Sequence, residues 1–338
     1  MGDGPKVVIA DYDFGDVDVE RKILEGAGLR VVAIQAKSED DLIVEAHDCD
    51  AVMNQYAHVG AKTIAAMSKC RVIARYGIGV DNVDVELATR RGILVTNVRD
   101  YCTEEVADHV MALLLALARR LLDYNRATHA GVWGWKAGRP AYRLRGRVLG
   151  ILALGRIARA IALRATGFGL RVVACDPYVE DSVFAQYGVT RVDKDQLIEQ
   201  SDYLVLQAPL TEETRHFVGE TELKRMKRNA ILINTARGPE VDNAALYRGL
   251  SEGWIASAGL DDLEEEPAKR RQWSPKDNPL FTLDNVIVTP HSAYYSEESI
   301  QMAREVAASE VARVLTGKRP NNPVNRVRLA DGSWSLPE

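Results

Sequence analysis

Short apolar segments alternate with amphipathic segments along almost the whole chain. Apolar runs of this length are typical of strands buried in a parallel sheet, and the segments between them have the helical period. In the N-terminal part the expected strands are Val7–Ala10, Arg30–Ile34, Ala51–Met53, Arg71–Arg75 and Ile93–Thr96. A second series comprises Val148–Leu152, Arg171–Cys175, Tyr203–Gln207, Ala230–Asn234, Ala256–Leu260 and Asn285–Val288. The alternation predicts an α/β fold with two doubly wound parallel sheets, each covered by helices on both faces.

One long helix is expected between the two series, over Glu104–Leu121. Thr103 is its expected N-cap, and two acidic residues lie in the first turn, where the helix dipole favours negative charge. The helix is apolar on all sides, which is unusual for a surface helix. We therefore expect it to be buried between domains or between subunits, and a dimer interface would suit its character.

Composition narrows the class of protein without identifying it. The chain has 338 residues, 46% of them hydrophobic and 27% charged, so its length suggests two domains, each large enough for its own core. Four cysteines without a CxxC pair indicate neither a disulfide framework nor a zinc site, and no metal is expected. No signal peptide is apparent, and the longest apolar run, Val110–Ala118, is too short to span a bilayer. A cytoplasmic protein with no membrane partner is the expectation.

Charge is distributed unevenly along the chain. The formal net charge is -5, but the segment Arg119–Arg147 carries eight basic residues and one acidic residue, a local charge of +7. Because this segment follows the apolar helix, we interpret it as an arm that wraps a second subunit of a homodimer, its cations facing acidic surface of the partner. Nucleic-acid binding through the same segment, where Trp133 and Trp135 lie among the cations, is an alternative that the net negative charge disfavours.

The strongest local motif spans residues 148–158, where a strand turns directly into a helix with Gly155 at the turn. Such a turn presents backbone N–H groups to a pyrophosphate, and Asp176, at the end of the next strand, is placed to bind ribose hydroxyls. Asp176 would repel a 2′-phosphate and no Arg follows it immediately, so NAD is favoured over NADP. The fingerprint reads A-x-G-x-x-A, and Ala153 suits its first position only with a negative φ. A purely structural capping role for Asp176 is the alternative.

Reactive side chains follow three further strands. Arg237, Glu266 and His291 each lie beyond the carboxyl end of a strand, where a doubly wound sheet forms its ligand crevice. In hydride transfer between NAD and a 2-hydroxy acid, His291 would be the acid and base at the hydroxyl oxygen. Glu266 would stabilise its imidazolium and fix the tautomer, and Arg237 would bind the substrate carboxylate and carbonyl. Each residue alone is more often structural, but three of them on one crevice favour an active site.

The order of these motifs resembles the D-isomer-specific 2-hydroxyacid dehydrogenase family. The resemblance extends over residues 5–325 and includes the loop after Arg75 and the segment that begins at Asn97. The sequence that follows His291 and the segment 316–325 resemble the branch with the C-terminal-binding-protein corepressors and the phosphoglycerate dehydrogenases.

This resemblance implies a Rossmann NAD-binding domain, residues 101–294, inserted into a flavodoxin-like substrate domain, residues 1–100 plus 295–338. It implies cofactor contacts at Thr103, Gly155, Arg156, Ile157, Asp176, Ala208, Pro209, Thr214, Thr235, Ala236, Asp261, His291 and Ala293. Asp261 would accept the nicotinamide carboxamide. Substrate contacts are implied at Tyr76, Gly77, Ile78, Gly79 and Arg237, with the backbone N–H groups of Ile78 and Gly79 on the carboxylate.

Two functions remain compatible with the sequence. The first is an NAD-dependent D-2-hydroxyacid dehydrogenase, acting as a 2-ketoacid reductase on a small 2-hydroxy or 2-keto acid. The second is a dimeric NAD(H)-sensing module that docks protein partners, as in the corepressors, with little turnover. The sequence leaves the substrate open among 3-phosphoglycerate, glycerate, a lactate-like acid and others.

Overall fold

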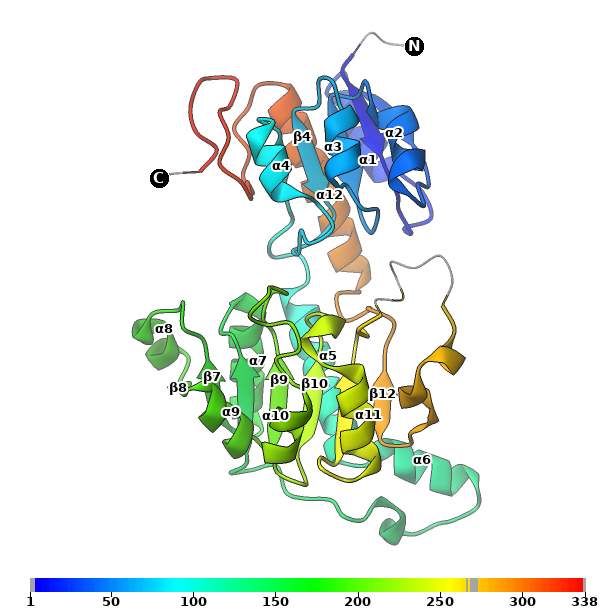
Figure 1. Cartoon of the computed structure of the whole chain (residues 1–338), viewed down its shortest axis with the longest axis vertical. Helices are drawn as coiled ribbons and strands as arrows, with labels where there is room; N and C mark the ends of the chain where they lie inside the picture. Colours follow the sequence, from blue (N-terminus) through cyan, green and yellow to red (C-terminus); the bar gives the residue numbers. More distant parts are fainter. Residues whose placement is uncertain (1–3, 266, 268–272, 337–338) are drawn as a thin grey trace. The chain divides into compact units, whose positions relative to one another are not determined.

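A computed structural model describes residues 4–265, 267 and 273–336 (Figure 1). The chain divides into two compact units. Unit 1 comprises Met1–Tyr101 together with Ser296–Glu338, and unit 2 comprises Cys102–Tyr295. Unit 2 is thus inserted into unit 1 along the chain. That unit 2 is the cofactor domain and unit 1 the substrate domain stays a prediction.

Unit 1 is built on a five-stranded parallel sheet in the order β2-β1-β3-β4-β5. Its strands are β1 (Lys6–Ile9), β2 (Arg30–Ala33), β3 (Ala51–Asn54), β4 (Val72–Arg75) and β5 (Leu94–Thr96). Its helices are α1 (Asp18–Gly26), α2 (Glu39–Ala46), α3 (Ala61–Ala66), α4 (Val85–Arg90) and α12 (Glu297–Leu315). Apolar side chains of α2, α3 and α4 share one buried cluster with the sheet, whereas α1 and α12 pack against each other and α12 against β3 and β4. The strand order is that of flavodoxin-like folds.

A buried ion pair joins the two ends of the chain within unit 1. Arg304 of α12 donates from Nη2 to Glu20 Oε2 of α1 and to Asp16 Oδ1, both at 2.8 Å. Glu20 is fully buried, and Arg304 supplies the counter-charge inside the fold. Residues from opposite ends of the sequence therefore complete one polar cluster.

Unit 2 is built on a seven-stranded parallel sheet in the order β12-β11-β10-β9-β6-β7-β8. Its strands are β6 (Val148–Leu152), β7 (Arg171–Cys175), β8 (Thr190–Arg191), β9 (Tyr203–Leu206), β10 (Ile231–Asn234), β11 (Ser257–Leu260) and β12 (Val286–Val288). The chain starts at β6, runs outward through β7 and β8, and then returns to the other side through β9. This is the Rossmann order, with its switch point at β6, so the predicted fold class of two doubly wound parallel sheets is confirmed.

Helices cover both faces of this second sheet (Figure 1). They are α5 (Thr103–Ala118), α6 (Leu121–His129), α7 (Arg156–Gly167), α8 (Asp181–Gln186), α9 (Lys194–Gln200), α10 (Glu220–Arg225) and α11 (Asn243–Ser251). Short 3-10 turns are η1 (Trp135–Gly138), η2 (Gly238–Glu240), η4 (Pro275–Asp277) and η5 (Pro279–Thr282). α5 and α7 bury their apolar side chains on one face, and α9, α10 and α11 bury theirs on the other. Among the described residues, no helix combines the length and apolarity needed to cross a membrane.

The apolar helix α5 differs from its prediction at both ends. Cys102 is its N-cap, so the prediction that Thr103 is the N-cap is wrong, and Thr103 is the first helical residue. Its buried side chains, among them Val110 and Leu114, lie in the core of unit 2 with Leu149 of β6 and Ile161 of α7. Its apolar character is therefore accounted for within its own domain, and burial of this helix against another domain or a second subunit stays a prediction. The helix also ends before Leu121, because Arg120 adopts a left-handed backbone with φ of 57° and starts α6 in a new direction.

Some cations of the basic arm, residues 119–147, form ion pairs with acidic residues of unit 2. Arg147 Nη1 lies 2.7 Å from Asp202 Oδ1, and Arg126 pairs with Asp284. The prediction that the arm's cations face a partner is therefore wrong for these two arginines. Most large apolar side chains of the arm are nevertheless exposed, and Trp133 is 92% exposed, whereas Leu144 packs against the core of unit 2.

Candidate active site

The turn between β6 and α7 contains a strained alanine. Ala153 has a φ of +67° and donates its N–H to Cys175 O at 2.9 Å. The expectation that φ is negative here is wrong, because the strand has to turn into the helix within three residues while keeping this bond to β7. A left-handed backbone costs an L-residue about 1–2 kcal/mol.

Ala153→Gly is expected to stabilise the protein. Glycine removes the energetic cost of the left-handed backbone. The greater conformational entropy of the unfolded chain lowers stability by about 0.4–1 kcal/mol, so the free energy of unfolding should rise by about 0.5–1 kcal/mol in total. Thermal unfolding should therefore shift upward by about 1–4 °C. The control is Ala158→Gly in the interior of α7, which should lower the transition temperature; a fall for Ala153→Gly as well would contradict the strain.

The same turn has the features of a dinucleotide site. Gly155 is the N-cap of α7, and open space surrounds the position that a Cβ would occupy. Asp176, at the end of β7, accepts the N–H of Leu154 at 2.7 Å and that of Tyr178 at 2.9 Å. Its carboxylate thus shapes the turn and retains free lone pairs for ribose hydroxyls. The buried hydroxyl of Thr103 finds no hydrogen-bond partner among the described residues, as expected of a group that awaits a ligand.

The structure also places an arginine beside Asp176 that sequence reasoning missed. Arg191, at the end of β8, donates from Nη1 to the backbone O of Asp176 at 2.5 Å and from Nε to Asp181 at 2.6 Å. The sequence separates Arg191 from Asp176 by a helix, so inspection of the residues just after Asp176 could not find it. Two neighbouring strands bring it there.

The remaining cofactor predictions fall in loops at the same edge of the sheet. Ala208 and Pro209 follow β9, and Thr214 closes that loop by donating to Pro209 O at 2.7 Å. Thr235, just after β10, accepts a bond from the Gln207 amide. Their contacts with a cofactor stay predictions, as do those of Arg156, Ile157, Ala236 and Ala293.

Arg237 is held by the turn that follows β10. Asn234 organises this turn, because its amide donates to Arg237 O at 2.8 Å and its Oδ1 accepts the Ala236 N–H at 3.0 Å. Arg237 itself donates from Nη1 to Ala236 O at 2.7 Å and is half-buried. At Gly238 a Cβ would stand 1.9 Å from Leu263 O, so glycine lets this turn approach the loop after β11.

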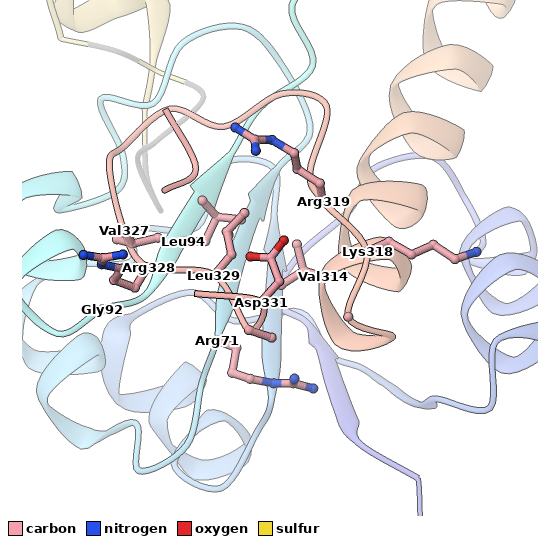
Figure 2. A pocket seen from close by; sticks show the side chains of 12 residues that line it. Arg71, Gly92, Leu94, Val314, Lys318, Arg319, Val327, Arg328, Leu329 and Asp331 are labelled. Atoms are coloured by element: carbon pink, nitrogen blue, oxygen red, sulfur yellow. The ribbon is translucent and has the colours of Figure 1, made fainter. Parts of the chain in front are cut away.

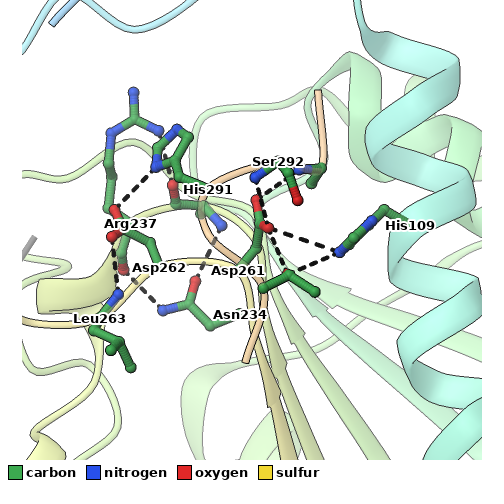
Figure 3. A network of polar contacts seen from close by, with 11 residues as sticks. His109, Asn234, Arg237, Asp261, Asp262, Leu263, His291 and Ser292 are labelled. Carbon is green, nitrogen blue, oxygen red and sulfur yellow. Dashed lines mark hydrogen bonds and ion pairs between the residues drawn. The ribbon is translucent and has the colours of Figure 1, made fainter. Parts of the chain in front are cut away.

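Asp261 fixes the loop that carries His291 (Figure 3). Its carboxylate accepts the hydroxyl of Thr289 at 2.6 Å and the N–H groups of Ser292 and Ala293, both at 2.9 Å. His109 of α5 reaches the same group through Thr289, with Nε2 3.0 Å from the Thr289 hydroxyl. Asp261 is therefore a structural anchor of the loop, and a bond to the nicotinamide carboxamide stays a prediction.

His291 is held at both its backbone and its ring. Its N–H donates to Asp261 O at 2.6 Å, and its φ of +53° is a left-handed conformation of the kind found where a site over-determines the backbone. Its Nδ1 lies 3.2 Å from Oδ2 of Asp262, the residue after Asp261 (Figure 3). Asp262 is not among the residues predicted from the sequence; the signal available was a second carboxylate immediately after a strand end.

The predicted partner of His291, Glu266, lies outside the described residues. Its two neighbours in the acidic run are engaged elsewhere: Glu264 lies 2.5 Å from His216 Nε2, and Glu265 accepts from Asn278 at 2.6 Å. Neither therefore competes with Glu266 for the role assigned to it.

A fully buried carboxylate lies next to this site. Glu240, in η2, is completely buried, and neither carboxylate oxygen has a hydrogen-bond partner among the described residues. Burial raises the pKa of Glu240 to about 8, although the charge of Arg237 opposes the shift. Glu240 is consequently mostly uncharged at neutral pH.

The predicted substrate loop follows β4 in unit 1. Tyr76 is buried, and Asn97 fixes the loop by donating to Ile78 O at 2.7 Å. The N–H groups of Ile78 and Gly79 donate to no residue in the described part of the chain, and both residues are half-exposed. These free donors are compatible with carboxylate binding, which stays a prediction for Tyr76–Gly79.

A separate cavity in unit 1, about 230 Å³, does not resemble a ligand site (Figure 2). Asp331 lies at its centre, while the charged ends of Arg71, Lys318 and Arg319 point in different directions. Arg71 donates to the backbone O of Leu315 at the end of α12, and Arg319 donates to the backbone O of Trp334. Across the described residues, no cluster of three or more His, Cys, Asp or Glu side chains could hold a metal ion.

Comparison with known proteins identifies relatives over most of the chain. The family model "D-isomer specific 2-hydroxyacid dehydrogenase, NAD binding domain" matches residues 111–293. A glyoxylate reductase of Korarchaeum cryptofilum is 42% identical over 293 residues, which cover 86% of each chain. A D-3-phosphoglycerate dehydrogenase of Methanocaldococcus jannaschii is 40% identical over 90% of this chain and 57% of its own length.

Solved structures agree with this similarity. A D-lactate dehydrogenase from Aquifex aeolicus, complexed with NAD and lactic acid, superposes with a TM-score of 0.84 at 26% identity, covering 98% of this chain and all of that chain. A glyoxylate reductase from Paecilomyes thermophila superposes with a TM-score of 0.85 at 25% identity, covering 95% of this chain and 98% of its own.

Proposed function

Since this chain belongs to the D-isomer-specific 2-hydroxyacid dehydrogenase family, we propose that it reduces a small 2-keto acid of the glyoxylate type to the 2-hydroxy acid. It is an NAD-dependent oxidoreductase of D-2-hydroxy acids, as its relatives are. The observation that carries the proposal is the held histidine at the edge of a Rossmann sheet, with Arg237 on a neighbouring loop.

The proposed chemistry assigns one task to each side chain. Arg237 binds the carboxylate of the keto acid and polarises its carbonyl. NADH, when bound, supplies the hydride that adds to the carbonyl carbon. His291 donates the proton from Nε2 to the carbonyl oxygen, and in the oxidative direction the same atom takes the proton back from the hydroxyl. Glu266 stabilises the imidazolium of His291.

The turn and strand ends of unit 2 are proposed to hold the cofactor. The N-terminus of α7 with Gly155 would receive the pyrophosphate, Asp176 the ribose hydroxyls, and the Thr103 hydroxyl a further polar group of the cofactor. In unit 1, the free N–H groups of Ile78 and Gly79 are proposed donors for the substrate carboxylate. The inserted unit 2 would thus be the cofactor domain, and unit 1 the substrate domain.

A substrate panel tests the proposal directly. NADH oxidation is followed with glyoxylate, hydroxypyruvate, pyruvate and 3-phosphohydroxypyruvate. We expect turnover with the small unphosphorylated acids, because Arg75, a cation close to the Tyr76–Gly79 loop, is already bonded to Tyr76 O at 2.5 Å. Preference for the phosphorylated acid would overturn the substrate assignment. Tight NADH binding without turnover on any acid would favour the NAD(H)-sensing alternative.

Asp176→Asn is expected to weaken discrimination between the two nicotinamide cofactors. Charge-assisted hydrogen bonds to ribose hydroxyls are worth about 1.5–3 kcal/mol, so KM for NADH should rise about 10–100-fold. KM for NADPH should rise less, since the repulsion of its phosphate is relieved. Asp195→Asn, at an exposed position on α9, is the control. Equal loss for both cofactors would mean that Asp176 only shapes the turn.

We also propose that the arm, residues 119–147, completes a homodimer. Trp133 and Trp135 are 92% and 66% exposed in the single chain, and large exposed aromatic side chains on one segment favour association. The double variant Trp133→Ser, Trp135→Ser should be monomeric by light scattering, whereas the wild type should be dimeric. Tyr178→Ser, at a 79% exposed aromatic outside the arm, is the control. A wild-type monomer would contradict the proposal.

A further inference from the structure

Two consecutive carboxylates follow β11, and they have different partners. Asp261 anchors the backbone and hydroxyl donors of residues 289–293, while Asp262 reaches the ring of His291 (Figure 3). The Asp262 side chain is only 7% exposed, so its charge acts at close range with little screening by water.

The Asp262 carboxylate is itself held in place. Oδ1 accepts the N–H of Leu263 at 2.9 Å, which leaves Oδ2 for the Nδ1 of His291 at 3.2 Å. A carboxylate oxygen can only accept, so His291 has to donate from Nδ1. The neutral ring then carries its proton on Nδ1, and Nε2 is the nitrogen with a free lone pair.

We propose that Asp262 is a positioning residue for His291, which fixes the Nδ1–H tautomer and aims Nε2 at the substrate oxygen. This inference rests on the acid–base role proposed for His291 and is additional to the role proposed for Glu266. The backbone O of Asp261 and the carboxylate of Asp262 hold the main chain and the ring of the same histidine, so the end of β11 sets both its position and its orientation.

Asp262→Asn tests the assignment with little disturbance of the turn. With its oxygen still accepting the Leu263 N–H, the asparagine presents its NH2 group, a donor, to the ring nitrogen that donates in the wild type. The wrong tautomer, with the proton on Nε2, then becomes populated. We expect kcat for keto-acid reduction to fall by about 10–100-fold, as for a group that acts through the acid–base residue. KM should change little, because Arg237 and the cofactor turn are untouched.

Nitrogen NMR of histidine-labelled protein reads the tautomer independently of turnover. The His291 signals are identified by their absence in His291→Gln. In the wild type we expect the neutral ring to be protonated on Nδ1, and in Asp262→Asn a mixture or the Nε2–H form. Glu264→Gln is the matched control, since it removes a neighbouring carboxylate that pairs with His216 instead. It should change neither the His291 signals nor kcat.

The outcomes separate this inference from the proposed function. A wild-type ring protonated on Nε2 would overturn it, and so would an unchanged tautomer in Asp262→Asn, even with reduced kcat. If the tautomer changes in Glu266→Gln but not in Asp262→Asn, Glu266 is the residue that fixes the tautomer. That result would also overturn the role proposed for Asp262. If the wild type turns over no keto acid, the proposed function fails, while the NMR comparison still decides whether Asp262 sets the tautomer.

Discussion

His291→Ala should lower kcat by about 10²–10⁴-fold while NADH binding remains nearly intact. A positioned general acid contributes an acceleration of this size, and alanine leaves the carbonyl oxygen without a proton donor. The loss should be similar for reduction and for oxidation, because the same nitrogen gives and takes the proton. We propose that the β6–α7 turn and Asp176 hold most of the cofactor, so its affinity should depend little on the imidazole.

Two measurements check this expectation. Steady-state rates with the preferred keto acid give kcat, and quenching of protein fluorescence by NADH gives the dissociation constant. His47→Ala, at an exposed position of unit 1, is the control and should behave like the wild type. Turnover near the wild-type rate across the pH range would remove His291 from the mechanism.

Glu240→Gln should stabilise the protein increasingly as the pH rises from about 5 to 8. The pKa of Glu240 is raised from 4.5 to about 8 in the folded protein, so the folded state retains a proton that the unfolded state has lost. The contribution of Glu240 to the free energy of unfolding therefore falls by about 1.4 kcal/mol for each pH unit in this interval and levels off above it. Glutamine does not titrate, and its advantage at pH 8 should reach about 3–5 kcal/mol.

Urea unfolding at several pH values measures this advantage. The difference between the two proteins should grow through the interval between the two pKa values and be constant above it. Glu252→Gln, at the exposed end of α11, is the control. A difference between Glu240→Gln and the wild type that does not depend on pH would mean that Glu240 is not buried in its neutral form.

The regular part of this fold could be predicted from the sequence because buried parallel strands have a strong apolar signature. Each strand of the two sheets was expected, except β8, whose two residues are exposed and carry no such signature. The end of α5 was missed because nothing about Arg120 favours a left-handed backbone. The local sequence pattern indicates only which structure a segment prefers. Strand β8 and the end of α5 depend instead on how these segments pack in the folded domain.

The residues of the candidate site also fall into those that the sequence predicts and those that depend on tertiary contacts. Strand ends placed Arg237, Asp261 and His291 correctly on one edge of the unit 2 sheet, because parallel strands share that edge. Asp262 and Arg191 depend on which side chains meet across neighbouring loops, and spacing along the chain does not encode this. Ala153 shows the limit most clearly, since a residue that avoids positive φ nevertheless adopts it under the demands of the turn.

The ion pair between Arg304 and Glu20 also has a consequence for how the protein is made. Glu20 is synthesised 284 residues before its partner, and all of unit 2 is translated in between. Until α12 emerges from the ribosome, the nascent N-terminal sheet exposes an apolar face and a carboxylate that has no counter-charge. Unit 2 can complete its own core first, so unit 1 is finished last. An apolar face that stays exposed for this long is the kind of surface that promotes aggregation of incomplete chains.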